Sequence, residues 1–155
     1  MVNSVVLATD GSCLRRAGPG GWAAILQQGS AEAVYAGGSA CTNSYRMELT
    51  ALLHGLNALA TLSWPHPAAL TVLTDCEPLA QGLNGQMARW AARDWHRVKD
   101  NDLWQAIAAT LPACPIQATW VPSRHHPLNQ HVDALARSAA LFADRAVLHP
   151  AICWE

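Results

Sequence analysis

The spacing of hydrophobic residues changes at about residue 44, and this change limits the folds open to the chain. Before it, three short runs, Val5–Thr9, Trp22–Leu26 and Ala33–Ala36, are separated by glycine-containing segments, a pattern typical of an antiparallel meander. Among these segments, Gly18–Gly21 predicts a turn. Beyond residue 44, leucines between Leu49 and Leu59 recur at the i, i+3, i+4, i+7 spacing of a helix with one buried face.

Strands and helices alternate over the rest of the chain. The two prolines of Trp64–Pro67 end the first helix. We expect strands at Leu70–Thr74 and Ile116–Val121, helical pieces over residues 78–111 and a last helix at Leu128–Ala143. This order predicts an α/β fold in which a five-stranded mixed sheet, an antiparallel meander followed by parallel strands, is flanked by helices. We expect one domain, residues 1–143, followed by a C-terminal tail, residues 144–155.

Composition excludes several classes of protein. The chain has 155 residues, of which 51% are hydrophobic and 14% charged, whereas a disordered chain has low hydrophobicity and high net charge. No apolar stretch approaches the roughly 18–20 residues of a membrane span, and no basic segment of a secretory signal opens the sequence. The net charge is −1, so any nucleic-acid binding must come from a local arrangement. Five separated cysteines without a C-x-x-C pair predict reduced thiols and a cytoplasmic protein.

Four acidic residues occupy positions that can converge. Asp10 and Asp75 each follow directly on an expected strand, Glu48 lies in the first turn of the leucine-rich helix, and Asp133 lies early in the last helix. Because ligand sites of open α/β sheets lie at the carboxyl ends of the strands, the four carboxylates can form one cluster. Such a cluster persists when a hard divalent cation neutralises it. Taken singly, each acid is also compatible with ordinary helix capping, and the spacing leaves both interpretations open.

Several sequence motifs, taken in order, resemble those of one family. They are Thr9-Asp10-Gly11-Ser12-Cys13, Gly18-Pro19-Gly20-Gly21-Trp22, Thr42-Asn43 with Arg46-Met47-Glu48-Leu49, Leu73-Thr74-Asp75-Cys76, Val98-Lys99-Asp100-Asn101-Asp102-Leu103-Trp104, and Trp120-Val121 with Asn129 and Asp133-Ala134-Leu135. From about residue 5 to residue 140 the chain resembles the type I ribonucleases H.

The resemblance implies a metal-dependent endonuclease that cuts the RNA strand of RNA–DNA hybrids and leaves 5′-phosphate and 3′-hydroxyl ends. It implies that Asp10, Glu48, Asp75 and Asp133 hold two Mg²⁺ ions in the presence of substrate, with Mn²⁺ as a possible replacement. Asp10 would bridge the two ions. Glu48 would also orient the RNA 2′-hydroxyl, which distinguishes RNA from DNA.

Members of this family usually carry a histidine in the loop before the last helix. Here the loop is Pro122-Ser123-Arg124-His125-His126-Pro127 and is one residue short. Counting from Trp120 places the family histidine at Arg124, and counting from Asp133 places it at Ser123. We favour His125 as the catalytic histidine because the pKa of histidine suits proton transfer near neutral pH. The alternative is that His125 and His126 are exposed or capping residues.

The resemblance also implies a set of substrate contacts. Residues Gln86–Lys99, which we term the handle segment, correspond to a basic segment that grips the DNA strand, but they hold few basic residues: Arg89, Arg93, Arg97 and Lys99. We therefore expect weaker hybrid binding than in relatives with a more basic handle. The substrate contacts implied by the resemblance are Cys13, Arg16, Thr42, Asn43, Glu77, Asn84, Trp90 and Trp95.

Three alternatives remain open from the sequence. An integrase or resolvase would share the strand-end acids but generally lacks the Gly-Pro-Gly-Gly and Asp-Leu-Trp motifs. A ribonuclease H domain of reverse-transcriptase type is a second alternative, and a catalytically weak module that binds hybrids is a third. We expect a monomer that takes an RNA–DNA hybrid as its partner and has no contact with a membrane.

Overall fold

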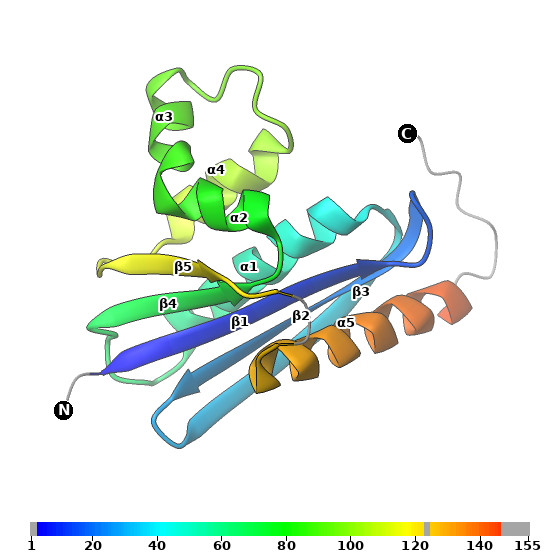
Figure 1. The fold of residues 1–155 in the computed structure, drawn as a ribbon, viewed down its shortest axis with the longest axis horizontal. Coiled ribbons are helices and arrows are strands. Elements are labelled where there is room, and N and C mark those ends of the chain that lie inside the picture. The colour runs from blue at the N-terminus through cyan, green and yellow to red at the C-terminus, as the bar shows by residue number, and fades with distance from the viewer. Residues whose placement is uncertain (1–2, 123–124, 147–155) are drawn as a thin grey trace.

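The computed structural model describes residues 3–122 and 125–146. Their strands form a five-stranded sheet in the order β3-β2-β1-β4-β5, with helices on both faces (Figure 1). The strands are β1 (Ser4–Cys13), β2 (Gly18–Gln28), β3 (Ala31–Thr42), β4 (Ala69–Thr74) and β5 (Ile116–Trp120). The helical elements are α1 (Ser44–Thr61), α2 (Glu77–Gln81), the π-helical η1 (Gly82–Gln86), α3 (Met87–Ala92), α4 (Asn101–Thr110) and α5 (Pro127–Ala146). The predicted mixed five-stranded sheet is confirmed.

The antiparallel part of the sheet is longer than the sequence pattern indicated. β1 runs three residues past Asp10, and Gly20 and Gly21 pair with Cys13 and Ser12. The prediction of a turn at Gly18–Gly21 is therefore wrong, because these residues begin β2. The reason lies in the packing of α5. A Cβ atom on Gly21 would overlap with the main chain of α5 at Ala136 and Ala140, so the glycine allows the helix to lie directly on the sheet.

The parallel part of the sheet sets the positions of two acids. β1 and β4 pair in parallel, and their last paired residues are Ala8 and Leu73. Asp10 and Asp75 each lie two residues beyond this pair. β1 continues past this point by pairing with β2 alone, so Asp10 lies inside a strand and not after its end. Both acids nevertheless lie at the carboxyl edge of the parallel pair, where the sequence placed them.

Two helices cover the two faces of the sheet. The predicted leucine stripe of α1 is confirmed: Leu49, Leu52, Leu56 and Leu59 are buried and pack with Leu7 and Leu26 of the sheet, among others. The fifth leucine of the stripe, Leu53, is half-buried against the same core. On the opposite face, Val132 and Ala136 of α5 pack against Ala8, Ala23 and Ile25. In Figure 1, α5 lies in front of the sheet and α1 behind it. The segment from α2 to α4 projects above β4 and β5.

Several expectations about the chain's ends and cysteines can be compared with the structure. Helix α5 extends to Ala146, past the expected domain boundary at residue 143, while residues 147–155 of the predicted tail lie outside the described residues.

Cys13, Cys76 and Cys114 are free thiols, whereas Cys41 is disulfide-bonded. The expectation of reduced thiols is thus wrong for Cys41. Within the described ranges, no helix combines the length and the apolar character that crossing a membrane requires.

Candidate active site

Asp10 and Glu48 meet because β1 and α1 approach each other at a glycine. A Cβ atom on Gly11 would overlap with the main chain of α1 at Met47 and Glu48. The first turn of α1 therefore lies against β1, and the Glu48 side chain reaches Asp10. Asp10 is 3% exposed and Glu48 8% exposed. The Gly11 N–H donates a hydrogen bond of 2.9 Å to Asp10 Oδ1.

Three acids, from β1, from α1 and from the connection after β4, form a compact cluster. Carboxylate oxygens of Asp10, Glu48 and Asp75 all lie within 4.8 Å of one another. Asp133, on α5, lies close enough to Asp10 to contribute to the rise in the pKa of Asp10. Its own carboxylate accepts a hydrogen bond of 3.2 Å from Arg137 Nε. The structure thus brings together all four acids that the sequence singled out.

None of these acids caps a described helix. The N-cap of α1 is Asn43, whose Oδ1 accepts a hydrogen bond from Arg46 N at 2.9 Å. The N-cap of α2 is Cys76 rather than Asp75, and α5 has no acidic residue in its first turn. The capping interpretation therefore does not account for the cluster.

The electrostatics of the cluster favour a bound cation. Burial is the main reason that the pKa of Asp10 is raised from 3.8 to about 7. The Glu48 side chain lowers this pKa, the neighbouring charge of Asp75 and the Asp133 side chain raise it, and the Gly11 N–H lowers it. Burial and the proximity of Asp10 raise the pKa of Glu48 well above its ordinary value. Glu48 Oε2 is buried without a hydrogen-bond partner in the described residues. Buried, mutually repelling carboxylates with a spare oxygen match the ligand preference of a hard divalent cation.

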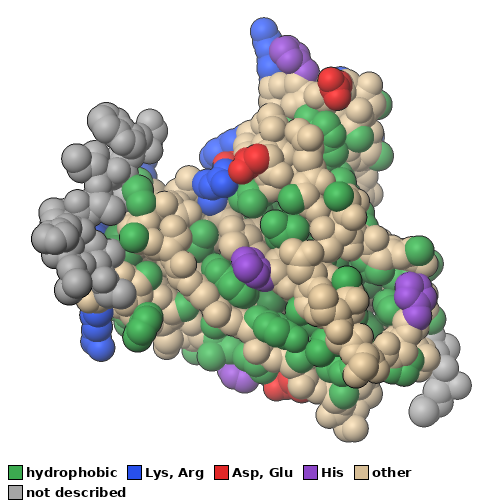
Figure 2. All heavy atoms as spheres, turned by 180° about the vertical axis from the view of Figure 1, so that it is seen from behind, with side chains coloured by type: hydrophobic (Ala, Val, Ile, Leu, Met, Phe, Trp, Pro, Cys, Tyr) green, Lys and Arg blue, Asp and Glu red, His purple; other side chains and the backbone are tan. Residues whose placement is uncertain are grey.

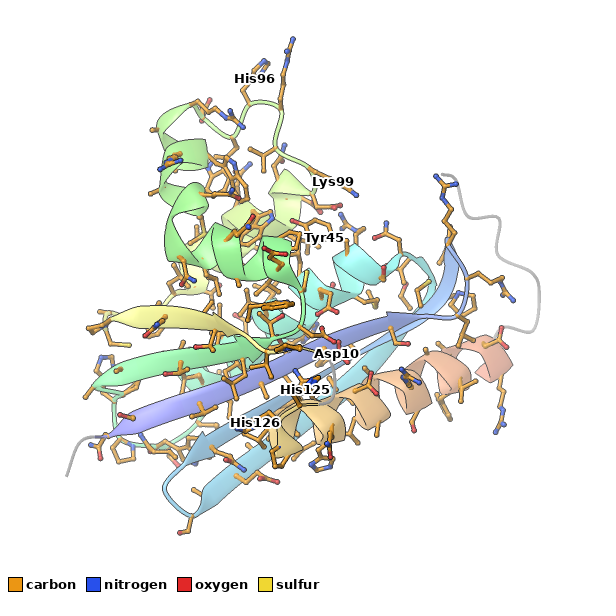
Figure 3. All side chains as sticks on the ribbon, viewed as in Figure 1. Asp10, Tyr45, His96, Lys99, His125 and His126 are labelled. Atoms are coloured by element: carbon orange, nitrogen blue, oxygen red, sulfur yellow. The ribbon has the colours of Figure 1, made fainter. Side chains whose placement is uncertain are left out.

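The two loop histidines have different environments. His126 is half-buried, and its Nδ1 accepts a hydrogen bond from Leu128 N at 3.2 Å, which caps the start of α5. His125 is exposed, and its Nδ1 lies 3.2 Å from Pro122 O. Figure 3 places both histidines before α5, on the side of the sheet that α5 covers. Ser123 and Arg124, the other candidates, lie outside the described residues.

Three of the implied substrate contacts meet where β1, β3 and α1 come together. The Cys13 thiol lies 3.6 Å from the carbonyl oxygen of Thr42 and 3.5 Å from that of Pro19, as a weak donor to both. Asn43 follows directly and uses its side chain to cap α1. Arg16 lies in the exposed connection between β1 and β2. Cys13, Thr42 and Asn43 therefore have structural contacts at the edge of the site.

The remaining implied contacts belong to the projecting helical part. Trp90 and Trp95 are partly buried against the main core, and the Trp90 ring lies edge-on to Trp104 with centroids 5.1 Å apart. Asn84 forms two hydrogen bonds of 2.8 Å with the main chain of Ala118 in β5. Glu77 is exposed at the start of α2. Trp90 and Trp95 therefore have packing contacts within the protein that bury part of each side chain.

Contacts that the sequence did not indicate join the end of the handle segment and the start of α4 to α1. Arg46 forms ion pairs of 2.6 Å with Asp100 and 2.9 Å with Asp102. Lys99 lies over the Tyr45 ring, 5.1 Å from its centroid, as Figure 3 shows. These partners are more than 50 positions apart in the sequence, so no local pattern could have paired them. On the face seen in Figure 2, charged side chains gather at this projecting part and few lie elsewhere.

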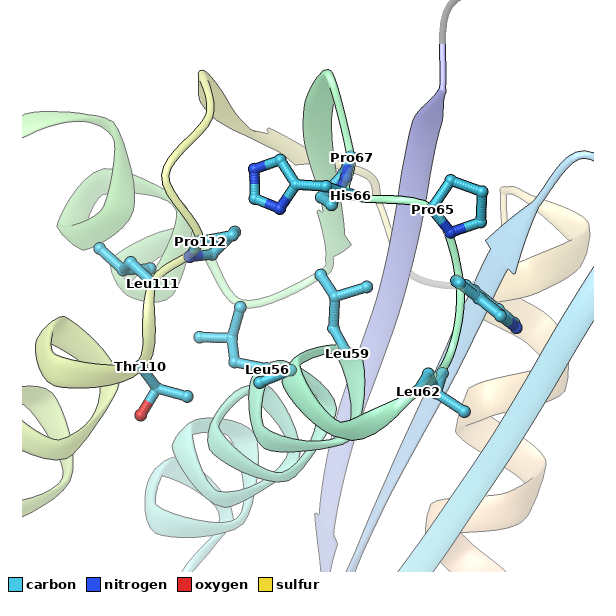
Figure 4. Close-up of a pocket in the computed structure, with 11 residues that line it drawn as sticks. Leu56, Leu59, Leu62, Pro65, His66, Pro67, Thr110, Leu111 and Pro112 are labelled. Atoms are coloured by element: carbon cyan, nitrogen blue, oxygen red, sulfur yellow. The ribbon is translucent and has the colours of Figure 1, made fainter.

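A cavity of about 320 Å³ lies away from the acids. It opens between the end of α1, the connection that follows it and the end of α4 (Figure 4). Leu56, Leu59, Leu62, Trp64, Pro65 and Pro112 are among its lining residues. Because none of the four clustered acids lines it, the cavity is not part of the candidate active site.

The fold and the site together define an enzyme of the ribonuclease H class, with a carboxylate cluster at the carboxyl edge of a mixed sheet. A family model described as RNase H matches residues 2–141. The chain is 36% identical over 146 residues to ribonuclease H of Xanthomonas axonopodis pv. citri (strain 306), a match covering 90% of this chain and 94% of the relative. It is 37% identical over 138 residues to ribonuclease H of Campylobacter concisus (strain 13826), covering 88% and 92%. The chain therefore belongs to the ribonuclease H family.

Solved structures agree on the fold. LC9-RNase H1 superposes with a TM-score of 0.80 at 22% identity, covering 92% of this chain and 74% of that one. The N-terminal ribonuclease H domain of a Mycobacterium tuberculosis protein gives a TM-score of 0.73 at 24% identity, covering 93% and 98%. LC11-RNase H1, solved in complex with an RNA/DNA hybrid, gives 0.69 at 17% identity, covering 90% and 98%.

Proposed function

We propose that this protein is an endoribonuclease that hydrolyses the RNA strand of RNA–DNA hybrids and leaves 5′-phosphate and 3′-hydroxyl ends. The observation that carries the proposal is the cluster of Asp10, Glu48 and Asp75, whose carboxylate oxygens lie within 4.8 Å of one another. Membership of the ribonuclease H family supports the reaction class. The relative LC11-RNase H1, which has the same fold, is described as bound to an RNA/DNA hybrid.

The four clustered acids would hold the divalent cations, Mg²⁺ in the first place and Mn²⁺ as an alternative. Mg²⁺ prefers oxygen ligands and is typically bound by a few carboxylates together with substrate phosphate. The buried, unpartnered Glu48 Oε2 fits this requirement. A pair of bound cations would stabilise the negative charge on the attacking and leaving oxygens of the phosphodiester.

Glu48 and Asp10 have separate tasks in this proposal. Asp10 interacts with both Glu48 and Asp133 and would supply carboxylate ligands to the cations. Glu48 can accept a hydrogen bond from the 2′-hydroxyl of the RNA strand, a group that DNA lacks. The specificity for RNA would therefore come from the same side chain that completes the carboxylate cluster.

His125 is the proposed proton-transfer residue. It is exposed in the loop before α5, whereas the ring of His126 is used to cap α5. His125→Ala should lower kcat by about 10-fold or more, because a positioned acid or base contributes at least that much. His126→Ala should instead lower the unfolding free energy by about 1 kcal/mol, as the loss of a helix cap does. Equal kcat values for native protein and His125→Ala would assign proton transfer elsewhere.

The handle segment is the proposed contact to the DNA strand. Arg89, Arg93 and Arg97 are exposed on it, and Lys99 is already engaged over Tyr45. Few positively charged side chains are therefore available to bind phosphates of the DNA strand, and we expect a modest affinity for the hybrid and a shallow dependence of that affinity on salt. Arg16, in the β1–β2 connection, would contribute a further phosphate contact at the other side of the site.

Cleavage of an end-labelled RNA–DNA hybrid tests the proposed function. Duplex RNA and duplex DNA serve as substrate controls, and reactions are run with Mg²⁺, with Mn²⁺ and with EDTA. Asp10→Asn is compared with Glu32→Gln, the same change of carboxylate to amide at an exposed residue of β3. We expect cutting of the hybrid alone, dependent on the cation, retained in Glu32→Gln and lost in Asp10→Asn. Binding of the hybrid without cutting would instead identify a non-catalytic module.

A monomeric state, a cytoplasmic location and the division into a domain at residues 1–143 and a C-terminal tail at residues 144–155 stay predictions. Sedimentation of the purified protein tests the first, and localisation of the tagged full chain tests the second. Truncation after residue 146 tests whether the tail is needed for cleavage.

A further inference from the structure

Asp75 lies just outside the hydrogen-bonded sheet, although the proposed site depends on it. β4 ends at Thr74, and the last pair between β4 and β5 joins Thr74 to Trp120. Asp75 follows that pair directly and precedes α2, which begins at Glu77. Its main chain therefore has no ladder of strand pairs to fix it, whereas Asp10 lies within β1.

The end of β5 supplies the contacts that the ladder lacks. Trp120 Nε1 donates a hydrogen bond of 3.1 Å to the main-chain carbonyl oxygen of Asp75. Next to it, Val121 N donates to the carbonyl oxygen of Thr74 at 2.8 Å. On the other side, Cys76 N donates to Thr74 Oγ1 at 3.0 Å. The peptide groups before and after Asp75 are thus both hydrogen-bonded. Val121 N binds the carbonyl oxygen of the first, and the indole N–H of Trp120 binds the carbonyl oxygen of the second.

The exposure of Trp120 shows that core packing is not its main contribution. The residue is 50% exposed, whereas Trp104, a core residue of α4, is 0% exposed. A large apolar side chain left half in water gains less from burial than one that is fully enclosed. The feature that separates tryptophan from a smaller aromatic residue at this position is its N–H group, which is the donor to Asp75.

We propose that Trp120 is a positioning residue for Asp75 and thereby tunes the affinity of the carboxylate cluster for its cation. This inference rests on the proposed function, because the cation is the ligand that the cluster is expected to hold. A hydrogen bond to the Asp75 peptide restricts where its carboxylate can lie relative to Asp10 and Glu48. Partners that orient metal ligands typically change metal affinity or activity by about 10- to 100-fold when they are removed.

Two variants remove the indole N–H, and a third serves as a matched control. Trp120→Phe keeps an aromatic ring, and Trp120→benzothienylalanine keeps the full bicyclic shape while replacing N–H by sulfur. Trp64→Phe makes the same change at the cavity of Figure 4, away from the acids. Mn²⁺ binding to the full chain is measured by electron paramagnetic resonance, and Mg²⁺ binding by titration calorimetry. The thermal midpoint without cation and the Mg²⁺ dependence of hybrid cleavage are measured on the same samples.

We expect both Trp120 variants to bind Mn²⁺ and Mg²⁺ about 10-fold more weakly than native protein, and Trp64→Phe to bind as native protein does. Raising the Mg²⁺ concentration should restore cleavage in the Trp120 variants. The benzothienylalanine variant should keep the native thermal midpoint. Native cation affinity in this variant would overturn the inference while leaving the proposed function intact. A native protein that neither binds a cation nor cuts the hybrid would overturn both.

Discussion

Asp10→Asn should make the cation-free protein more stable at neutral pH while it abolishes hybrid cleavage. Asp10 is 3% exposed, and the pKa of its carboxylate is raised from 3.8 to about 7, chiefly by burial. Between these two pH values the native state binds more protons than the unfolded state. Stability therefore falls as the pH rises from about 4 to about 7. Asparagine keeps the shape of the side chain and cannot ionise, so this loss disappears.

The expected size of the effect follows from the shift in the pKa of Asp10. A rise from 3.8 to about 7 corresponds to about 4 kcal/mol of unfolding free energy above pH 7, at roughly 1.4 kcal/mol for each pKa unit. For a chain of this size, 1 kcal/mol moves the thermal midpoint by about 2–4 °C. Asp10→Asn should thus raise the cation-free midpoint at pH 8 by on the order of 10 °C. At pH 4 the variant and the native protein should differ little.

Urea and thermal unfolding in EDTA, followed by circular dichroism from pH 4 to pH 8, measure this effect. Glu32→Gln is the matched control, because Glu32 is an exposed residue of β3 and its substitution should change stability by less than about 0.5 kcal/mol. Adding Mg²⁺ should stabilise the native protein and not Asp10→Asn. If the two proteins lost stability in parallel as the pH rose, the electrostatic account of the cluster would be wrong.

Three other perturbations have defined outcomes. Gly21→Ala should push α5 away from the sheet and lower the unfolding free energy by about 1–3 kcal/mol in urea titrations, because its Cβ overlaps with the helix main chain. Arg46→Ala removes the guanidinium that pairs with the Asp100 carboxylate, whose side chain is 12% exposed. This change should lower the urea-derived unfolding free energy by about 1–3 kcal/mol. Unchanged stability would mean that solvent screens the ion pair. Arg93→Ala should flatten the slope of log binding constant against log salt by about 1, and an unaltered slope would show that this handle residue contacts no phosphate.

Local patterns in the sequence determined most of the secondary structure. The leucine spacing located α1, and the apolar runs located β4 and β5 to within one residue at each end. These patterns succeed because the side-chain period of a helix or strand is set by the backbone over a few neighbouring residues. The four acids could likewise be chosen from the sequence, although their positions alone also allowed helix capping and the resemblance to the type I ribonucleases H was needed to decide between the two.

Tertiary contacts decided the features that local patterns misplaced. Gly20 and Gly21 resemble a turn locally, but they belong to β2 because α5 lies too close to the sheet for a side chain at Gly21. Asp10 lies inside β1 because the hairpin with β2 continues after the pairing with β4 has ended. A glycine in the sequence shows only that no side chain is present. The neighbours packed around it in the structure show whether the glycine is needed for a turn or for the close approach of another element.

The connection between the site and its surroundings also required the three-dimensional structure. The Asp75 carbonyl and the Trp120 indole are 45 positions apart, and Arg46 and Asp100 are 54 positions apart. Such pairs depend on strand order and on the docking of α4 against α1, which no short-range periodicity specifies. The sequence by itself therefore determined which side chains could bind a cation. The register of β1 against β4 and the packing of α1 and α5 on opposite faces determined that those side chains meet.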